Sequence, residues 1–580
     1  MDYPTIIPYD NYVRIRIIND LDSVYGGVSA ISDACYNSLV YGQSEDYTIY
    51  VMPGGATTYT YNNGWLPNSP VGASTSADTI IIDAGTANIS ASTDCNTITV
   101  NPGAALTIDS GVTLTTTTID LNSTSQLFSS LISDGTITGV VNYNRYTSQI
   151  GTNDLISAPV SGQQFTAFAA LNANLAASAT TIRAFAPYNT AAGAYQNYDL
   201  ITNALTTIDS GIGYRAATTD GSTLMFTGTV RTDDVLDIPI SDAAAGFAWN
   251  LIGNPYPSYI DFDTFFTTNA NEFDSGSAYQ AIYGYDGNAS NGWTVWNLAT
   301  IADGTVTELI APGQAFFVKA KSGGGLVDFT TGMRTTGTSD DFIAGRNSTT
   351  NVALCKLNLI SATNNASTQI YFIEGTTRGL DIGYDAGSYL GSAADYSIYS
   401  NLVEDNLGLD MAIQSLPYDD FNSIIVPLGI KTQPNEALTI SIDDLFSLPS
   451  NTYVYLDDTV ENTLTLLNTN DYTFMPVSEL NGVGRFYLRF SSDALSTIKN
   501  ELNDLQIYTN AIPKEIVIQG LLTNKTEAHI YDIQGRLVIR QDLDLTNTSN
   551  RISVSNLSTG IYIVKVSSIN NVETKKLIIN

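Results

Sequence analysis

Histidine content narrows the chemistry that this chain can perform. His529 is the single histidine among 580 residues. A Ser-His-Asp or Cys-His catalytic group needs histidine as its base, and zinc sites commonly use histidine ligands. His529 lies in an alternating apolar segment near the C-terminus, so we interpret it as a strand residue. The sequence offers no catalytic residue by this route, and we expect a protein that is not an enzyme.

Pairs of carboxylates are the next groups that could act in catalysis, because most glycosidases use two of them. With 57 Asp and Glu in the chain, close pairs are expected by chance, and solvated loops are the simpler interpretation. The same oxygens could bind Ca²⁺, although no EF-hand spacing occurs. We therefore predict no cofactor, with Ca²⁺ the one ion that the composition leaves open. The pairs are Asp261 with Asp263, Asp381 with Asp385, and Asp457 with Asp458.

Tryptophan side chains could stack on sugar rings. Trp293 and Trp296, in the segment NGWTVWN, are the best local candidates for a surface glycan. Packing within strands is the simpler explanation for both, because large aromatic rings dominate protein cores.

Composition and charge indicate an extracellular β protein. Apolar residues make up 43% and charged residues only 14%, below the usual ~25%. Residues 505–580 contain eight Lys and Arg against six Asp and Glu, so they carry +2 and the preceding residues carry −35. An acidic body repels phosphate backbones, which makes nucleic acid an unsuitable partner. The change of sign near residue 505 predicts a domain boundary.

The sequence contains neither a membrane-spanning pattern nor a secretory signal pattern. No run of about 20 apolar residues occurs, so we expect no transmembrane helix. Met1 is followed by DYPTIIPYDN, which lacks the basic and apolar regions of a secretory signal, so we expect the natural start to lie upstream. Cys35, Cys95 and Cys355 have no metal-ligand spacing and predict no disulfide framework.

Alternation of apolar and polar residues runs through the whole chain and predicts an all-β, multidomain protein. Short strands with Gly or Pro-Gly corners recur in 53–146, and each is too short to bury its own apolar face, so stacking into a small β-solenoid is expected. The segments 147–343 and 344–497 read as two β-sandwich modules. The one helical pattern runs from Asp493 to Leu505.

Regions of the chain before residue 498 resemble known families of the Bacteroidota. Residues 1–52, with RIRI at 14–17 and YGQSEDYTIYV at 41–51, resemble the second half of a GEVED domain. Residues 53–146 resemble adhesin-like repeats of Bacteroidota surface proteins. The segments GIGYRA at 211–216, WNLIGNPYPSYIDF at 249–262 and APGQAFFV at 311–318 resemble the β module that precedes sorting signals in many flavobacterial secreted proteins.

The segment 498–580 carries the most specific pattern. It contains AHIYDIQGRLV at 528–538, NLSTGIYIVKV at 556–566 and ETKKLIIN at 573–580. These motifs resemble the type A C-terminal sorting domain of type IX secretion cargo, for which an immunoglobulin-like sandwich is expected. The family's usual Tyr-Pro-Asn-Pro opening is replaced by Tyr-Thr-Asn-Ala at 508–511, which leaves type C open. The residues that match the family's motifs are Tyr531, Asp532, Gly535, Arg536, Leu557, Gly560, Tyr562, Lys575 and Lys576.

This resemblance implies a secreted or outer-membrane surface protein. Its partners would be the type IX translocon, the outer-membrane shuttle barrel and the sortase-like peptidase of the same system. We expect a non-catalytic region that directs export and displays an upstream domain. Two alternatives remain open: a surface adhesin that binds glycan or matrix through its β modules, and the C-terminal part of a secreted hydrolase.

Overall fold

The computed structural model confirms an all-β protein of several domains, with 52% strand and 7% helix. Contacts divide it into two compact units, Met1–Phe490 and Ser491–Asn580. Cys35 and residues 493–504 of the expected helix lie outside the described residues. For 12–20 and 42–50 only the backbone is described. The described residues are 12–20, 42–50, 55–243, 248–285, 287, 293–302, 309–340, 352–389, 394–406, 408–492, 505–510, 513–520, 522, 525–545, 547, 549–568 and 572–579.

A two-stranded antiparallel hairpin comes first. Strands β1 (Tyr12–Asp20) and β2 (Gly42–Tyr50) pair from Tyr12 opposite Tyr50 to Asp20 opposite Gly42. This is the segment for which the sequence suggests half of a GEVED domain.

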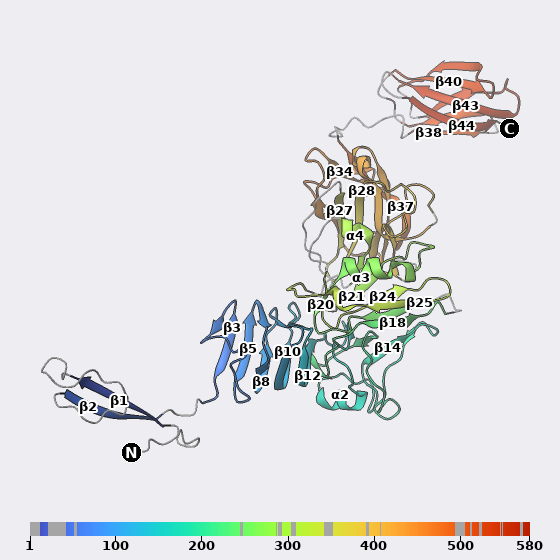
Figure 1. Cartoon of the computed structure of the whole chain (residues 1–580). Helices are drawn as coiled ribbons and strands as arrows, with labels where there is room; N and C mark the ends of the chain where they lie inside the picture. The colour runs from blue at the N-terminus through green and yellow to red at the C-terminus, as the bar shows by residue number, and fades with distance from the viewer. Residues whose placement is uncertain are drawn as a thin grey trace. The chain divides into compact units, whose positions relative to one another are not determined.

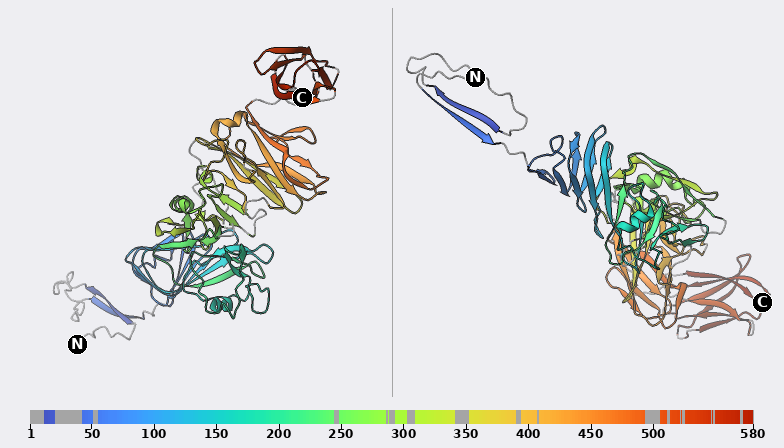
Figure 2. Two further views of the ribbon diagram at one scale, coloured as in Figure 1. Left: turned by 90° about the vertical axis from the view of Figure 1, so that its right-hand side faces the viewer. Right: turned by 90° about the horizontal axis from the view of Figure 1, so that it is seen from below.

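A small parallel β-solenoid follows and confirms the stacked arrangement expected from the sequence (Figures 1 and 2). Thr79 pairs with Thr97, and Thr97 pairs in turn with Thr118, so each rung adds about 20 residues. Side chains alternate, and the inward row is fully buried, as at Ile98 and Leu121. One sheet contains β3 (Thr58–Asn62), β5 (Thr79–Ala84), β8 (Thr97–Val100), β10 (Thr113–Asn122) and β12 (Thr136–Tyr146), and the other contains β6 (Thr86–Ile89), β9 (Ala105–Ile108) and β11 (Ser130–Ser133).

Antiparallel strands cover both ends of the larger solenoid sheet. The short β4 (Trp65–Leu66) pairs with β3, and β17 (Thr223–Gly228) pairs with β12. Covered edges protect a parallel sheet from pairing with other chains. Because β17 comes from the next segment, the solenoid core continues without a break to Phe226.

The middle segment combines small sheets with short helices. Its two four-stranded sheets are antiparallel, and a second core forms around Phe265 and Phe316. The elements are β13 (Asp154–Ser157), β16 (Gly213–Ala216), β14 (Phe185–Asn189) and β15 (Ala194–Tyr195) in one sheet, β19 (Trp249–Gly253), β24 (Ala315–Lys319), β21 (Ile282–Tyr285) and β22 (Trp293–Trp296) in the other, and helices α2 (Phe165–Leu171), α3 (Phe262–Asn269) and α4 (Leu298–Ala302).

An eleven-stranded sheet system follows up to Ser491. The first four residues of its strand β27 (Val352–Ile360) are buried on both faces: Cys355 faces one core, and Leu354 faces a core that also contains Trp249 and Phe317. The segments on either side of residue 343 therefore pack through one shared core. Burial raises the pKa of the Cys355 thiol, so this residue behaves as a small core side chain.

The C-terminal unit is a seven-stranded sandwich with its own core, which includes Ile518, Ile530 and Val564. One sheet has three strands in the order β38-β39-β42, and the other has four in the order β41-β40-β43-β44. The strands are β38 (Gln506–Asn510), β39 (Glu515–Gln519), β40 (Glu527–Asp532), β41 (Leu537–Asp542), β42 (Ser549–Ser553), β43 (Gly560–Ser567) and β44 (Val572–Ile579).

Candidate functional site in the C-terminal unit

The turn between β40 and β41 is fixed by Asp532. Its Oδ1 accepts hydrogen bonds from the backbone N–H groups of Gln534 (2.9 Å) and Arg536 (3.0 Å), and its Oδ2 pairs with Arg536 Nε at 2.7 Å. The hydrogen bond from the Arg536 backbone is the largest of the effects that lower the pKa of Asp532. Gly535 has a φ of +78°, where a side chain would be strained. These residues shape the turn, and the Arg536 side chain remains mostly exposed.

Tyr562 anchors the loop that precedes β43. Its ring lies in the core, and its hydroxyl donates a hydrogen bond of 3.0 Å to the carbonyl of Ser558. Leu557 packs against the same core, and its carbonyl accepts a hydrogen bond from Lys514 Nζ at 3.0 Å. Leu557 and Tyr562 therefore serve the core and the loop, while Gly560 begins β43 opposite Ile579.

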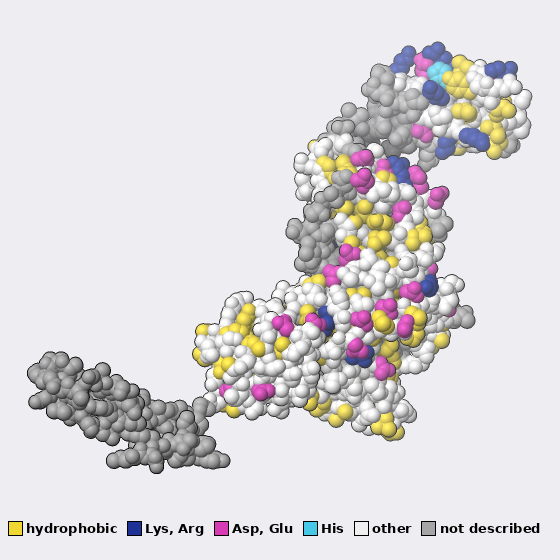
Figure 3. Space-filling model, in the orientation of Figure 1, with side chains coloured by type: hydrophobic (Ala, Val, Ile, Leu, Met, Phe, Trp, Pro, Cys, Tyr) yellow, Lys and Arg dark blue, Asp and Glu magenta, His cyan; other side chains and the backbone are white. Residues whose placement is uncertain are grey.

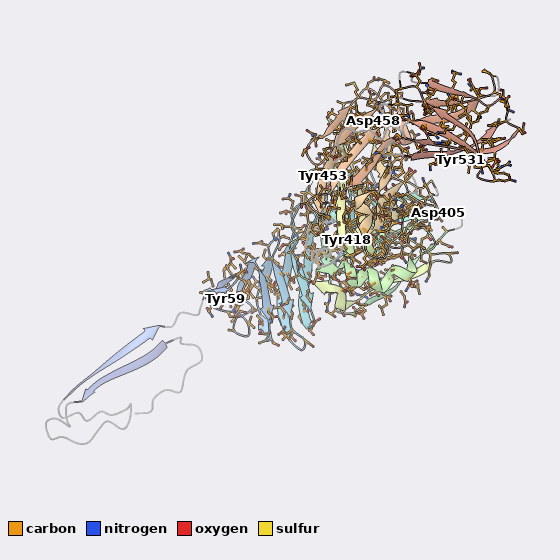
Figure 4. All side chains as sticks on the ribbon, turned by 90° about the horizontal axis from the view of Figure 1, so that it is seen from above. Tyr59, Asp405, Tyr418, Tyr453, Asp458 and Tyr531 are labelled. Carbon is orange, nitrogen blue, oxygen red and sulfur yellow. The ribbon has the colours of Figure 1, made fainter. Side chains whose placement is uncertain are left out.

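The outer face of the four-stranded sheet presents one continuous row of cross-strand partners. Tyr531 on β40 lies opposite Leu537 on one side and Ile563 on the other, and Ile563 lies opposite Lys576 on β44. Cross-strand partners point to the same face, so the four side chains line up across the sheet. Figure 4 labels Tyr531 on this sheet.

A second row on the same face is also apolar. Ile561 lies opposite Ile578, two residues along from Ile563. The exposed fractions are 39% for Ile561, 38% for Ile563 and 59% for Ile578. We call Tyr531, Leu537, Ile561, Ile563, Ile578 and Lys576 the outer apolar face.

Cations border this face. His529 lies opposite Lys565 and Arg540, in the row next to Tyr531. In Figure 3, apolar, Lys and Arg side chains share the visible surface of this unit, where the single His is also seen. Arg540 pairs with Glu527 at 2.7 Å, whereas Lys575 falls on the opposite face from Lys576 because side chains alternate along a strand.

The nine residues predicted from the motifs thus divide by position. Tyr531 and Lys576 share the outer apolar face, and Arg536 lies in the exposed turn at the end of β40. Asp532, Gly535, Leu557 and Tyr562 shape turns or fill the core, and Gly560 begins β43. The isoleucines of the face were missed. Their signal was the run Ile561–Val564, which places apolar side chains on both sides of one strand.

The carboxylate pairs considered for catalysis have structural partners. Asp261 caps helix α3 by accepting a hydrogen bond from Thr264 N at 2.8 Å. Asp385 is fully buried and accepts hydrogen bonds from Asp381 N (2.7 Å) and Ser415 N (2.6 Å). Burial raises the pKa of Asp385 to about 7, and these two hydrogen bonds act in the opposite direction.

Asp457 and Asp458 belong to ion pairs of the large sheet system. Asp457 pairs with Arg489 Nε at 2.8 Å. Asp458, labelled in Figure 4, is fully buried and receives Arg485 Nη2 at 2.7 Å and the Tyr472 hydroxyl at 2.8 Å. Adjacent side chains on a strand point to opposite faces, so the two carboxylates do not converge on one substrate.

The two candidate tryptophans differ in exposure. Trp296 is 2% exposed and packs on Phe262 with ring centroids 5.2 Å apart, so neither face of its ring is open to a sugar. Trp293 is 38% exposed and stacks on Tyr389 at 4.5 Å, near Tyr285 at 5.1 Å.

Among the residues that the structure describes, no three His, Cys, Asp or Glu side chains gather as a metal site requires. Within that same part of the chain, no helix is long and apolar enough to cross a membrane.

Comparison with known families agrees with the geometry of the tail. Residues 506–580 match the family described as a secretion system C-terminal sorting domain. The chain is therefore cargo of the type IX secretion system, secreted or placed at the cell surface, and its tail interacts with that machinery. Residues 54–490 match the family described as a domain of unknown function, DUF8693, and the chain belongs to that family. No curated protein matches the chain.

Proposed function

We propose that this chain is a non-catalytic region that carries an upstream domain to the cell surface, and that the export machinery binds the outer apolar face of its tail. The shuttle barrel and the sortase-like peptidase of the type IX system are the partners that we infer. The observation that carries the proposal is the three exposed isoleucines, Ile561, Ile563 and Ile578, on one face of a small independent sandwich.

An apolar face of this kind favours a protein partner. The outer sheet of a solvated sandwich normally alternates polar side chains outward and apolar side chains inward. Here the outward positions of β43 are Ile561, Ile563 and Lys565. Contiguous exposed apolar surface rimmed by charge is typical of an interaction site. Lys576 within this face and Lys565 at its border would favour a partner that combines apolar side chains with acidic ones.

Substituting Ile563 by Asp tests this role. We expect surface delivery to fall by about tenfold or more, because a carboxylate in place of Ile563 would remove apolar contact area and would have to lose its water when the partner binds. The fold should persist, since Ile563 lies outside the core. Delivery is measured by immunoblot of the surface and periplasmic fractions, and thermal unfolding of the purified protein reports the fold.

Leu545→Asp is the matched control. Leu545 belongs to the same unit, has a similar exposed fraction of 40% and lies in the loop after β41. It should be delivered as wild type. Normal delivery of the Ile563→Asp protein would contradict the proposed face, as would an equal loss in both variants.

A further inference from the structure

A small hollow opens in the middle segment, within the first unit. Its volume is about 290 Å³, just below the roughly 300–1,000 Å³ of typical ligand pockets, so it would fit one sugar unit. Apolar side chains, including Ile150, form part of its wall. Four polar side chains also line it: Asn153, Ser178, Asn197 and Arg215.

Arg215 is the charged group of this hollow. It lies on β16, between Leu155 and Ala186 of the neighbouring strands, and its guanidinium carbon is 4.1 Å from the centre of the Tyr195 ring. Among the described residues, no ion pair or hydrogen bond to the Arg215 guanidinium occurs.

That isolation is unusual in this acidic body. Five other arginines of the body each pair with at least one aspartate, at 2.5–3.1 Å for the closest N–O contact. A guanidinium offers a planar fork of N–H donors that matches a carboxylate with two parallel hydrogen bonds. Arg215 keeps this fork available at the wall of a hollow. The paired arginines are Arg231, Arg334, Arg378, Arg485 and Arg489.

The wall around Arg215 is held in place. Tyr285 donates its hydroxyl to the carbonyl of Thr152 at 3.0 Å, next to Asn153 in the loop that lines the hollow. Asn153 itself adopts a φ of +59°, a conformation that asparagine tolerates better than most residues. The amide and hydroxyl groups of Asn153, Asn197 and Ser178 can donate and accept hydrogen bonds, as sugar hydroxyls require.

We propose that this hollow binds a monosaccharide unit that carries a carboxylate, such as a uronic acid of a polysaccharide. Arg215 binds the carboxylate, the Asn and Ser side chains bind the ring hydroxyls, and Ile150 contacts the apolar face of the ring. This inference goes beyond export and display and does not depend on the outer apolar face, since all its residues lie in the first unit.

Calorimetric titration of the purified full chain with glucuronic acid tests the site. Glucose and sodium acetate are the comparison ligands. We expect saturable binding of glucuronic acid only. Arg215→Met should weaken it about tenfold or more, because a charge-assisted pair of hydrogen bonds is lost. Arg183→Met is the control: Arg183 lies on the same segment, and its Nη1 donates to the carbonyl of Thr180.

Three variants and three ligands distinguish the possible outcomes. Arg183→Met should bind glucuronic acid as wild type, and unchanged thermal unfolding would show that Arg215→Met is folded. Asn197→Ala, at an exposed position, should also weaken binding. Equal binding of acetate would overturn the sugar in favour of any carboxylate. Absent saturable binding, or binding that Arg215→Met leaves unchanged, would overturn the site itself.

Discussion

Removing residues 506–580 is expected to abolish delivery of the chain to the surface and the medium. The sorting domain lies within these residues, and fourteen of the fifteen buried residues of its core belong to them. The deletion therefore removes the part that interacts with the type IX machinery and leaves the cores of residues 55–490 complete. Fractionation and immunoblotting should find the truncated protein in the periplasm.

The truncated body must remain folded for this result to be informative. Its thermal unfolding should match that of the corresponding transition in the full chain, because the two units have separate cores. A folded, truncated protein that still reaches the surface at the wild-type level would show that the tail is dispensable for export.

Replacing Arg485 by Met is expected to lower the free energy of unfolding of the large sheet system by about 3 kcal/mol. The substitution leaves the buried Asp458 carboxylate without its cation, and breaking a buried pair from one side costs roughly 3–5 kcal/mol. The low end applies because Arg485 is itself 18% exposed. Urea denaturation followed by circular dichroism measures the change.

The effect of Arg485 should depend on pH in a defined direction. Burial acts to raise the pKa of Asp458, but the hydrogen bonds from Arg485 and Tyr472, with those from the backbone, prevail and lower it. A carboxyl whose pKa is lowered by folding stabilises the folded state at pH values above its pKa in the unfolded chain, which is about 3.9. This contribution is lost as the pH falls through the folded-state pKa. The difference in free energy of unfolding between wild type and Arg485→Met should therefore have its largest value near pH 7 and decrease below about pH 4.

Arg489→Met provides the matched control. Arg489 pairs with Asp457, which is 19% exposed, and Arg489 is 36% exposed, so solvent screens the pair. A pair of this kind contributes about 0–1 kcal/mol. Equal losses from the two substitutions, or a loss from Arg485→Met that is unchanged at pH 3, would contradict the structural account of Asp458.

The local parts of the fold could be predicted from sequence, because alternation and corner residues are local signals. The stacked strands around Ile80, Ile98 and Ile119 follow from short alternating segments separated by glycine corners. The pairing of β17 with β12 could not be predicted in this way, since strands about 80 residues apart carry no local signal of their partnership. The core shared by Trp249 and Leu354 could not be predicted for the same reason, since these residues are far apart in the sequence.

The sequence predicts the motif residues of the candidate site by type, whereas the strand register decides which face each side chain occupies. Asp532 and Gly535 were recognisable as turn residues, and the structure shows them shaping the turn. Tyr562 looked like part of a recognition motif, yet its ring lies in the core. Ile563 could not be predicted as a surface residue, because an isoleucine in a strand is usually buried and only the register beside Tyr531 places it on the outer face.

The central claim is that residues of the tail are sufficient for export. The direct measurement is a reporter that carries a secretory signal and residues 499–580, expressed in a bacterium with a type IX system and in a strain lacking the translocon. We predict delivery to the surface or medium in the first strain and retention in the periplasm in the second. Periplasmic retention in both strains, or delivery in both, would contradict the claim.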